Sequence, residues 1–293
     1  MVEIREHLFI TDFHRLFKEN GLTPKVIKLF QEIIYEYYKN YKRKFPFREN
    51  ITPYNVLVSE IMLQQTQTGR VSEKFLKFIA KFPDFLSLSK APLEEILIEW
   101  KGLGYNRRAI ALRKIAKIII SDYNGKLPES IEELTLLPQI GHNTASSILT
   151  FAFNKPMVFI ETNVRRVYIY FFFPNSNKVN DREIMSIVKK TVDKNNPREW
   201  YYALMDYGVM LKKIHPELSK RSSHYRKQAH FKGSDRQIRG ELLRLLINDR
   251  TLSIDKVMKH FKNIAPNRID DILYQLENEG FIKNEGDIIR ISK

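Results

Sequence analysis

The chain has no cysteine among its 293 residues. This absence excludes disulfides, and it excludes zinc sites and iron–sulfur clusters that cysteine would hold. No run of about 18 uninterrupted apolar residues is present, so the sequence predicts no membrane-spanning helix. Residues 1–20, MVEIREHLFITDFHRLFKEN, carry acidic side chains and lack the apolar core of a secretory signal. We expect a protein that is not secreted, either cytoplasmic (nucleoid-associated) or nuclear.

Acidic side chains are also fewer than basic ones. The chain has 49 Lys+Arg against 34 Asp+Glu, which gives a formal net charge of +15. An excess of this size favours a polyanionic partner, with nucleic acid as the first candidate and an anionic membrane surface as the second. The plain alternative is a solvated basic surface. The length and the hydrophobic fraction of 43% are sufficient for one large domain or two moderate ones.

Helical periodicity dominates the sequence, and alternating strand-like patterns are scarce before residue 280. Apolar residues recur at three- and four-residue spacing in 26–45, 55–65, 71–81, 93–100, 107–122, 131–136, 143–153, 181–193 and 198–211. Short connections with glycine, proline or asparagine separate these segments, as in KGLGY and LPQIG. The predicted fold class is therefore mostly α.

The composition changes at residues 212–232, a basic segment with seven Lys/Arg and little apolar periodicity. Beyond it, 236–249, 252–261 and 266–280 have helical patterns, and 281–292 has the pattern of two short strands around a turn at Glu285–Gly286. Three helices followed by a hairpin is the pattern of a winged helix. We predict a domain at 1–233, with an N-terminal extension at 1–24, and a small winged-helix-like α+β domain at 234–293.

Two motifs in the first half suit contact with nucleobases. In PYNVLVSEIMLQQTQ (53–67), Glu60 and Gln64 share a helical face and Gln65 flanks it. An acid beside amides can grip a base edge, which offers donors and acceptors. In KGLGYNRRA (101–109), Tyr105 occupies a glycine-flanked turn before two arginines, where an aromatic ring can stack on bases or wedge between them. The plain alternatives are a solvated stripe and a tyrosine that packs over its loop.

A third segment, LPQIGHNTASSILTFAFNKPMVFIETNVRRV (137–167), has the form of a helix–hairpin–helix turn followed by an acid and a basic helix. We expect Gly141 to supply an unusual backbone angle, and the N–H groups of 141–145 to face a phosphate. The carboxylate is Glu161, and the cations that follow it are Arg165 and Arg166. The plain alternative is that these arginines pair with acids on neighbouring helices.

Together these segments resemble the helix–hairpin–helix DNA glycosylase superfamily. They are most similar to the MutY-type adenine glycosylases, which remove adenine mispaired with 8-oxoguanine. The resemblance covers roughly residues 25–211, and it includes FPFR (45–48), W100 and YALMDYGVM (202–210) in the order of the family's motifs. GSDRQIRGELLRLL (233–246) is also similar to a C-terminal tail seen in some members. The implied fold is a helical protein of two subdomains.

The resemblance also implies roles for individual residues. Glu60 would protonate the departing adenine, and Glu161 would stabilise the positive charge that develops on the sugar. Gln65 would fill the gap left in the base stack, and Tyr105 would wedge beside the opposing base. The predicted DNA- and base-binding residues are Gln64, Gln65, Tyr105, Gln139, Gly141, Asn143, Thr144, Arg165 and Arg166.

Three departures from the family pattern matter. Glu161 stands where the family has aspartate, and Gln139 stands where the hairpin has its first glycine. Asn143 stands where some relatives have lysine, so no amine is available for a Schiff base and we expect a monofunctional enzyme. The four cysteines that hold an iron–sulfur cluster in most relatives are missing. We therefore expect no cofactor and no metal, with the 212–232 segment in place of the cluster loop.

The leading interpretation is a monofunctional DNA repair glycosylase that removes mispaired adenine opposite 8-oxoguanine or G. Its expected partner is double-stranded DNA with a mismatch or an oxidised base, bound by a monomer. The alternatives are a thymine/uracil mismatch glycosylase, and a mismatch- or lesion-binding protein whose catalysis was lost with the aspartate. A transcription regulator built on the winged helix is more distant, because it leaves 25–211 unexplained.

Overall fold

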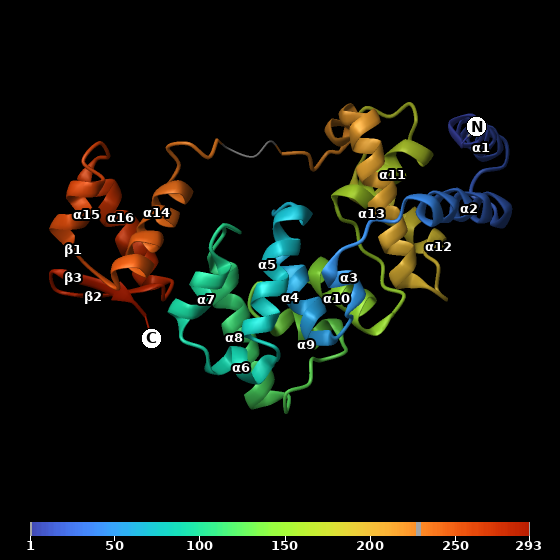
Figure 1. The fold of residues 1–293 in the computed structure, drawn as a ribbon. Helices are drawn as coiled ribbons and strands as arrows, with labels where there is room; N and C mark the ends of the chain where they lie inside the picture. Colours follow the sequence, from blue (N-terminus) through green and yellow to red (C-terminus); the bar gives the residue numbers. More distant parts are fainter. Residues whose placement is uncertain (1, 227–229, 293) are drawn as a thin grey trace. The chain divides into compact units, whose positions relative to one another are not determined.

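The computed structural model describes the backbone of residues 2–226 and 230–292, and the side chains of 10–226 and 230–292. The chain is mostly helical, which confirms the predicted fold class (Figure 1). It divides into two compact units. The first comprises Met1–Phe45 and Gly141–Lys227, and the second comprises Pro46–Ile140 and Gln228–Lys293. In the described part of the chain, no helix has the length and apolar character needed to cross a membrane.

The first unit is built from helices around an aromatic core. Its elements are α1 (Val2–Asn20), α2 (Pro24–Tyr41), α10 (His142–Phe153), α11 (Thr162–Phe172), α12 (Asp181–Thr191), α13 (Pro197–Ile214) and the 3-10 helix η1 (Pro216–Arg221). Phe30 of α2 lies 5.0 Å from Phe171 of α11 and 5.5 Å from Trp200 of α13, measured between ring centroids. Edge-on contacts of this kind add to the stability gained from burying the rings.

Helix α1 belongs to this core, although the sequence patterns did not single it out as a helix. Phe13 is fully buried, and its ring centroid lies 5.1 Å from that of Phe171. At least one aromatic side chain therefore packs the predicted N-terminal extension, residues 1–24, against α11 in the core of the first unit.

The second unit begins with helices of 4 to 16 residues. Its elements before the hairpin are α3 (Pro46–Glu49), α4 (Pro53–Leu63), α5 (Thr68–Lys81), α6 (Phe85–Lys90), α7 (Leu93–Trp100), α8 (Arg107–Asp122) and α9 (Ile131–Leu136). Helix α4 starts with proline at its first position, and the Thr52 hydroxyl accepts a hydrogen bond from the Asn55 backbone N–H at 3.1 Å. Phe75, Phe78 and Trp100 are fully buried in the core of this unit.

The C-terminal part of the second unit confirms the winged-helix-like pattern (Figure 1). Its elements are α14 (Asp235–Asp249), β1 (Thr251–Ser253), α15 (Ile254–His260), α16 (Pro266–Asn278), β2 (Ile282–Glu285) and β3 (Ile288–Ile291). The strands form an antiparallel sheet in the order β1-β3-β2, with Leu252 opposite Ile289. The boundary near residue 233 stays a prediction, because 228–293 groups with 46–140.

Candidate active site

Glu60 lies in the last turn of α4, a helix that is buried over most of its length. Its sequence PYNVLVSEIML contains a single acidic side chain, and Glu60 is partly exposed between the buried Ser59 and Ile61. The helix ends at Leu63, so Gln64 is the C-cap residue with an extended backbone rather than part of the last helical turn. The structure therefore presents one carboxylate at the end of an apolar helix.

Arg108 fixes the end of α4 to the turn that carries Tyr105. Its side chain is buried, at 4% exposure. Nη1 donates hydrogen bonds to the carbonyl oxygens of Ile61, Met62 and Gln64 at 2.9, 2.8 and 2.6 Å. These are terminal helix carbonyls that lack partners within the helix. Nη2 donates to the Leu103 and Gly104 carbonyls at 3.2 and 2.9 Å.

Burial lowers the pKa of Arg108 to about 10, which leaves the guanidinium charged at neutral pH. Its planar fork of donors suits several backbone carbonyls at once, which a lysine ammonium does not. The sequence predicted a basic pair beside Tyr105, but not that the second arginine is internal. The sequence offers one indication that Arg108 is internal: it follows an exposed arginine directly at the start of α8.

Three of the predicted DNA-contact residues share an unusual backbone conformation. Gln65, Tyr105 and Gln139 have φ values of 55°, 47° and 60°, in the left-handed region that non-glycine residues rarely adopt. Strained backbone of this kind is typical of functional turns. Gln139 Nε2 donates a hydrogen bond to the Arg107 carbonyl at 3.4 Å. The second unit thus brings together the turns that hold Gln64, Gln65, Tyr105 and Gln139.

The hairpin turn differs from the prediction in one respect. Gly141 has φ −88° and ψ 174°, so the expectation that it supplies the unusual angle is wrong. The left-handed residue is Gln139, because the turn reverses the chain between the buried anchors Leu137 and Ile140. A Cβ atom at Gly141 would meet no atom of the chain within 4 Å.

The N-terminus of α10 offers backbone donors beside Gly141. The Ala145 N–H is used within the helix, since it bonds the Gly141 carbonyl at 2.9 Å. The phosphate site was predicted at this N-terminus, over the N–H groups of 141–145, and phosphate binding there stays a prediction. The exposed Asn143 instead uses its side-chain amide to hold the Ile160 carbonyl at 3.2 Å, which fixes the segment just before Glu161.

Glu161 is the N-cap residue of α11. Its Oε1 accepts hydrogen bonds from the backbone N–H groups of Asn163 and Val164 at 2.7 and 2.8 Å, and its Oε2 accepts one from Asn163 Nδ2 at 3.1 Å. Burial raises the pKa of Glu161, and these donors together with Arg166 and Arg165 act in the opposite direction. The carboxylate also lies at the positive end of the helix dipole.

Arg166 and Gly208 hold α11 against α13. Arg166 is 3% exposed, and Nη1 donates to the Gly208 carbonyl at 2.6 Å and to Asn163 Oδ1 at 2.9 Å. A Cβ atom on Gly208 would lie 2.4 Å from the Asn163 carbonyl oxygen, so only glycine permits this approach. Asn163 and Gly208 support Glu161, and neither was identified from the sequence.

Both arginines after Glu161 have partners within the chain, and for Arg165 the partner is an acid on a neighbouring helix, as in the plain alternative. Arg165 forms a two-point ion pair with Asp181, with Nε–Oδ1 and Nη2–Oδ2 distances of 2.7 Å each. DNA contact by Arg165 and Arg166 stays a prediction, and the burial of Arg166 opposes it.

The described part of the 212–232 segment is attached to the first unit by hydrogen bonds. Arg221 donates to the carbonyls of Phe173, Pro174 and Ser176, the last at 2.8 Å. Ser219 accepts from Arg166 Nη2 at 3.1 Å. Residues 227–229 of this segment lie outside the described residues. Because the chain has no cysteine, its side chains do not fit the cysteine-held iron–sulfur cluster that the resemblance would imply.

The two predicted catalytic carboxylates belong to different units, Glu60 to the second and Glu161 to the first. Their meeting in one pocket stays a prediction. Each is nevertheless supported by neighbours within its own unit: Arg108 holds the end of the helix that carries Glu60, and Asn163 holds the Glu161 carboxylate.

Comparison with known proteins identifies relatives. Residues 58–194 match the family described as "HhH-GPD superfamily base excision DNA repair protein". The chain is 37% identical over 188 residues to the adenine DNA glycosylase of Buchnera aphidicola subsp. Baizongia pistaciae, covering 62% of this chain and 53% of that protein. It therefore spans about half the length of this relative. It is 30% identical over 193 residues to the thymine/uracil-DNA glycosylase of Methanothermobacter thermautotrophicus, covering 64% of this chain and 87% of that protein.

Solved structures agree with this assignment. A thermostable thymine-DNA glycosylase superposes with a TM-score of 0.57 at 28% identity, covering 63% of this chain and 86% of that chain. Endonuclease III in a non-covalent DNA complex superposes with a TM-score of 0.55 at 21% identity, covering 66% and 89%, which indicates a shared fold. The family match includes Glu60, Tyr105, Gly141 and Glu161. The chain belongs to the HhH-GPD superfamily of base excision DNA repair proteins.

Proposed function

We propose that this protein is a monofunctional DNA glycosylase that hydrolyses the N-glycosidic bond of adenine mispaired with 8-oxoguanine or G. The observation that carries the proposal is the placement of Glu60, the one acidic side chain of α4, in the last turn of a helix that is buried over most of its length. A carboxyl group in such surroundings is suited to proton donation. Relatives named as adenine DNA glycosylases add support.

In the proposed reaction, the adenine is first rotated out of the duplex. Glu60 donates a proton to the departing base while the bond between the base and the sugar breaks. Glu161 stabilises the positive charge on the sugar until water adds to the anomeric carbon, and the proton that this water loses returns Glu60 to its acid form. The products are free adenine and an abasic site. Asn143 provides no amine, so no covalent Schiff base forms between protein and sugar.

The proposed substrate is double-stranded DNA that contains a mismatch or an oxidised base, bound by one copy of the chain. The net charge of +15 and the backbone donors at the start of α10 support phosphate binding. No iron–sulfur cluster or other cofactor takes part in this proposal.

Two other functions compete with adenine removal. A thymine/uracil glycosylase is favoured by the relative of that name, of which this chain covers 87%. A binding protein without catalysis is favoured by Glu161, which stands where the family has aspartate and whose carboxylate already caps a helix.

A single-turnover assay distinguishes these functions. Duplexes that carry A, T or U opposite G or 8-oxoguanine are incubated with excess protein, and abasic sites are cleaved with alkali. We expect excision of adenine above all, and Glu60→Gln should abolish it with nearly unchanged DNA binding. Equal excision by wild type and Glu60→Gln would contradict the role of Glu60, and preferred removal of T or U would replace adenine as the substrate.

The Glu161 series tests the binding-only function. Glu161→Gln retains an oxygen that can accept the capping hydrogen bonds but carries no charge, so it should fold normally and be nearly inactive. Glu161→Asp should retain or improve activity, because aspartate both caps helices and keeps the charge. If wild type excises no base and Glu161→Asp does, the natural protein is a binding protein. If all forms are inert and bind tightly, the enzyme proposal fails.

A further inference from the structure

The C-terminal part of the second unit contacts Tyr105 directly. Arg236, in the first turn of α14, donates a hydrogen bond from Nη1 to the Tyr105 hydroxyl at 2.8 Å. Its guanidinium carbon lies 5.7 Å from the centroid of the tyrosine ring. Tyr105 and Arg236 are 131 positions apart in the sequence, so this contact depends on how 234–293 packs within the unit.

A carboxylate fixes α14 and α16 beside the same turn. Glu279 accepts hydrogen bonds from Arg107 Nε and Nη2 at 2.8 and 2.6 Å, and from Arg239 Nη2 at 2.5 Å. Burial acts to raise the pKa of Glu279, but the hydrogen bonds from the two arginines outweigh it and the pKa is lowered. The carboxylate is therefore ionised near neutral pH, and it joins the start of α8 to the helix that carries Arg236.

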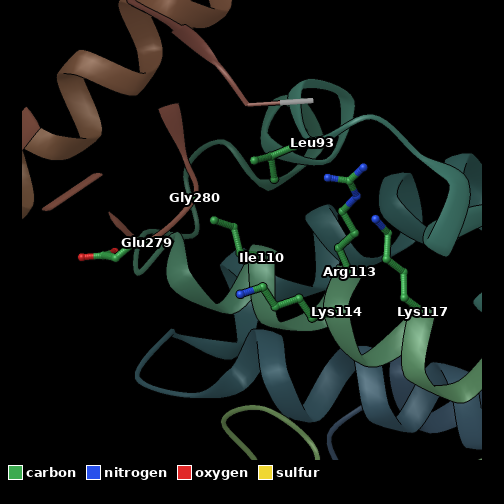
Figure 2. Close-up of a pocket in the computed structure, with 7 residues that line it drawn as sticks. All are labelled: Leu93, Ile110, Arg113, Lys114, Lys117, Glu279 and Gly280. Carbon is green, nitrogen blue, oxygen red and sulfur yellow. The ribbon is translucent and has the colours of Figure 1, made fainter. Parts of the chain in front are cut away.

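Next to the Glu279 contact lies a cavity. It is enclosed by α7 and α8 on one side and by Glu279 and Gly280, which follow α16, on the other. Figure 2 shows four side chains of α8 around this cavity of about 200 Å³. The lining residues are Leu93, Ile110, Arg113, Lys114, Lys117, Glu279 and Gly280. Glu279 is the one acidic residue of this lining, and its carboxylate pairs with Arg107 and Arg239. The placement of α14 on the Tyr105 turn thus depends on specific polar contacts.

The backbone of Tyr105 is already held by Arg108, whose guanidinium carbon also lies 5.5 Å from the centroid of the tyrosine ring, and Arg236 adds a hydrogen bond to the hydroxyl. Tyr105 has φ 47°, and Arg108 donates to the carbonyls of the two peptides that flank it, those of Gly104 at 2.9 Å and Tyr105 at 3.4 Å. A charged donor on the hydroxyl fixes the direction of the ring. A ring that is to wedge beside a base must be presented in one direction before the base arrives.

We propose that Arg236 is a positioning residue for Tyr105, through which the C-terminal domain takes part in discriminating the base opposite the excised one. The proposal rests on the proposed function, because that function makes Tyr105 the contact to the opposing base. The partner recognised is the unpaired base of a DNA duplex, which stacks on the tyrosine ring.

The test compares Arg236→Ala, Tyr105→Phe and the double variant with a matched control. Arg244→Ala removes an arginine from the same helix whose partner, Glu241, also lies on α14. For each protein, the single-turnover excision rates on adenine opposite 8-oxoguanine and adenine opposite C give a selectivity ratio. Fluorescence anisotropy on the same duplexes gives a binding ratio, and thermal unfolding reports the folded state.

We expect Arg236→Ala and Tyr105→Phe each to lower the selectivity ratio by about tenfold, the size of effect expected for losing one hydrogen bond to a charged group. The double variant should lose no more than either single variant, because each removes the same contact. Arg236→Lys should restore part of the ratio, and Arg244→Ala should match wild type. The unfolding temperatures should stay within the range of the control.

Other outcomes overturn the proposal. If the two losses multiply in the double variant, Arg236 acts independently of Tyr105. If Arg236→Ala weakens binding to all duplexes equally and leaves both ratios unchanged, it is a phosphate contact alone. If wild type excises no base, the proposed function fails on its own, and the binding ratio still decides whether Arg236 acts through Tyr105.

Discussion

At the scale of single residues, Arg108 supports two of the turns on which the proposed activity depends. Replacing it with lysine leaves at most three donors for the carbonyls that its guanidinium now satisfies. We expect Arg108→Lys to lower the free energy of unfolding by about 3 kcal/mol or more, because buried carbonyls would be left without partners. Urea denaturation measures the loss, and the exposed Arg244→Lys should change stability by no more than about 0.5 kcal/mol.

Glu161 gives a pH-dependent prediction at the same scale. Its pKa is raised in the folded protein, above the ordinary value of about 4.3. A raised folded pKa means that folding is favoured while the group is protonated, and that this advantage disappears as the pH rises through the folded pKa. Wild type should therefore lose stability relative to Glu161→Gln as the pH rises from about 4 upwards. Urea denaturation across this range checks the sign, and a relative gain by wild type would show that capping outweighs burial.

At the scale of secondary-structure elements, the contact of α11 with α13 depends on Gly208. A methyl group there would displace Asn163, whose backbone and side chain both donate to Glu161. We expect Gly208→Ala to destabilise the fold by about 1–3 kcal/mol. It should also slow excision by about tenfold or more, because a small displacement of a catalytic carboxylate is costly.

The matched control is Gly240→Ala in α14. A Cβ atom at Gly240 would meet nothing within 4 Å, so this change should stabilise the protein by about 0.5–1 kcal/mol through lower backbone entropy in the unfolded chain. Thermal unfolding and the single-turnover assay compare both variants. Equal effects of the two substitutions would contradict the close packing of α13 on Asn163.

Elements also show what the sequence could and could not predict. Long amphipathic helices such as α8 and α12 and the C-terminal hairpin were predicted, because burial imposes a periodic pattern on them. Strand β1 has three residues, which are too few to show a sequence pattern. It was not predicted, because it forms through pairing with β3. Gln65 and Gln139 were predicted as contacts, but their left-handed backbone was not, since it is set by the turns around them. The inward direction of Arg108 and Arg166 could not be predicted, because an arginine in the first two turns of a helix has the same sequence pattern whether it is buried or exposed.

At the scale of the whole molecule, the C-terminal domain should be held to the Tyr105 turn by charge. We expect Glu279→Gln, or salt near 0.5 M, to loosen this contact, because paired surface charges are weakened by screening. The absence of cysteine allows spin labels to be placed at Lys101→Cys and Lys262→Cys without other labelled sites. Pulsed electron resonance should then show a narrow distance distribution in wild type at low salt and a broad one in Glu279→Gln.

The control for this prediction is Glu285→Gln. The Glu285 carboxylate pairs with Arg290 within the hairpin at 2.5 Å, so its loss should leave the label distances unchanged. A narrow distribution in Glu279→Gln at every salt concentration would show that other contacts hold the domain.

The attachment of this domain to the rest of the chain has a consequence for how strong the Glu279 contact needs to be. Segments joined covalently meet at an effective concentration in the millimolar range, so a contact that would be about half formed between separate molecules at millimolar concentration is half formed here. One bridging carboxylate and one hydrogen bond then need to supply only a somewhat tighter than millimolar affinity to keep Arg236 on Tyr105 most of the time. A contact of this strength also dissociates at a small cost in free energy. Arg236 can therefore leave Tyr105 and return to it while the protein stays bound to one duplex.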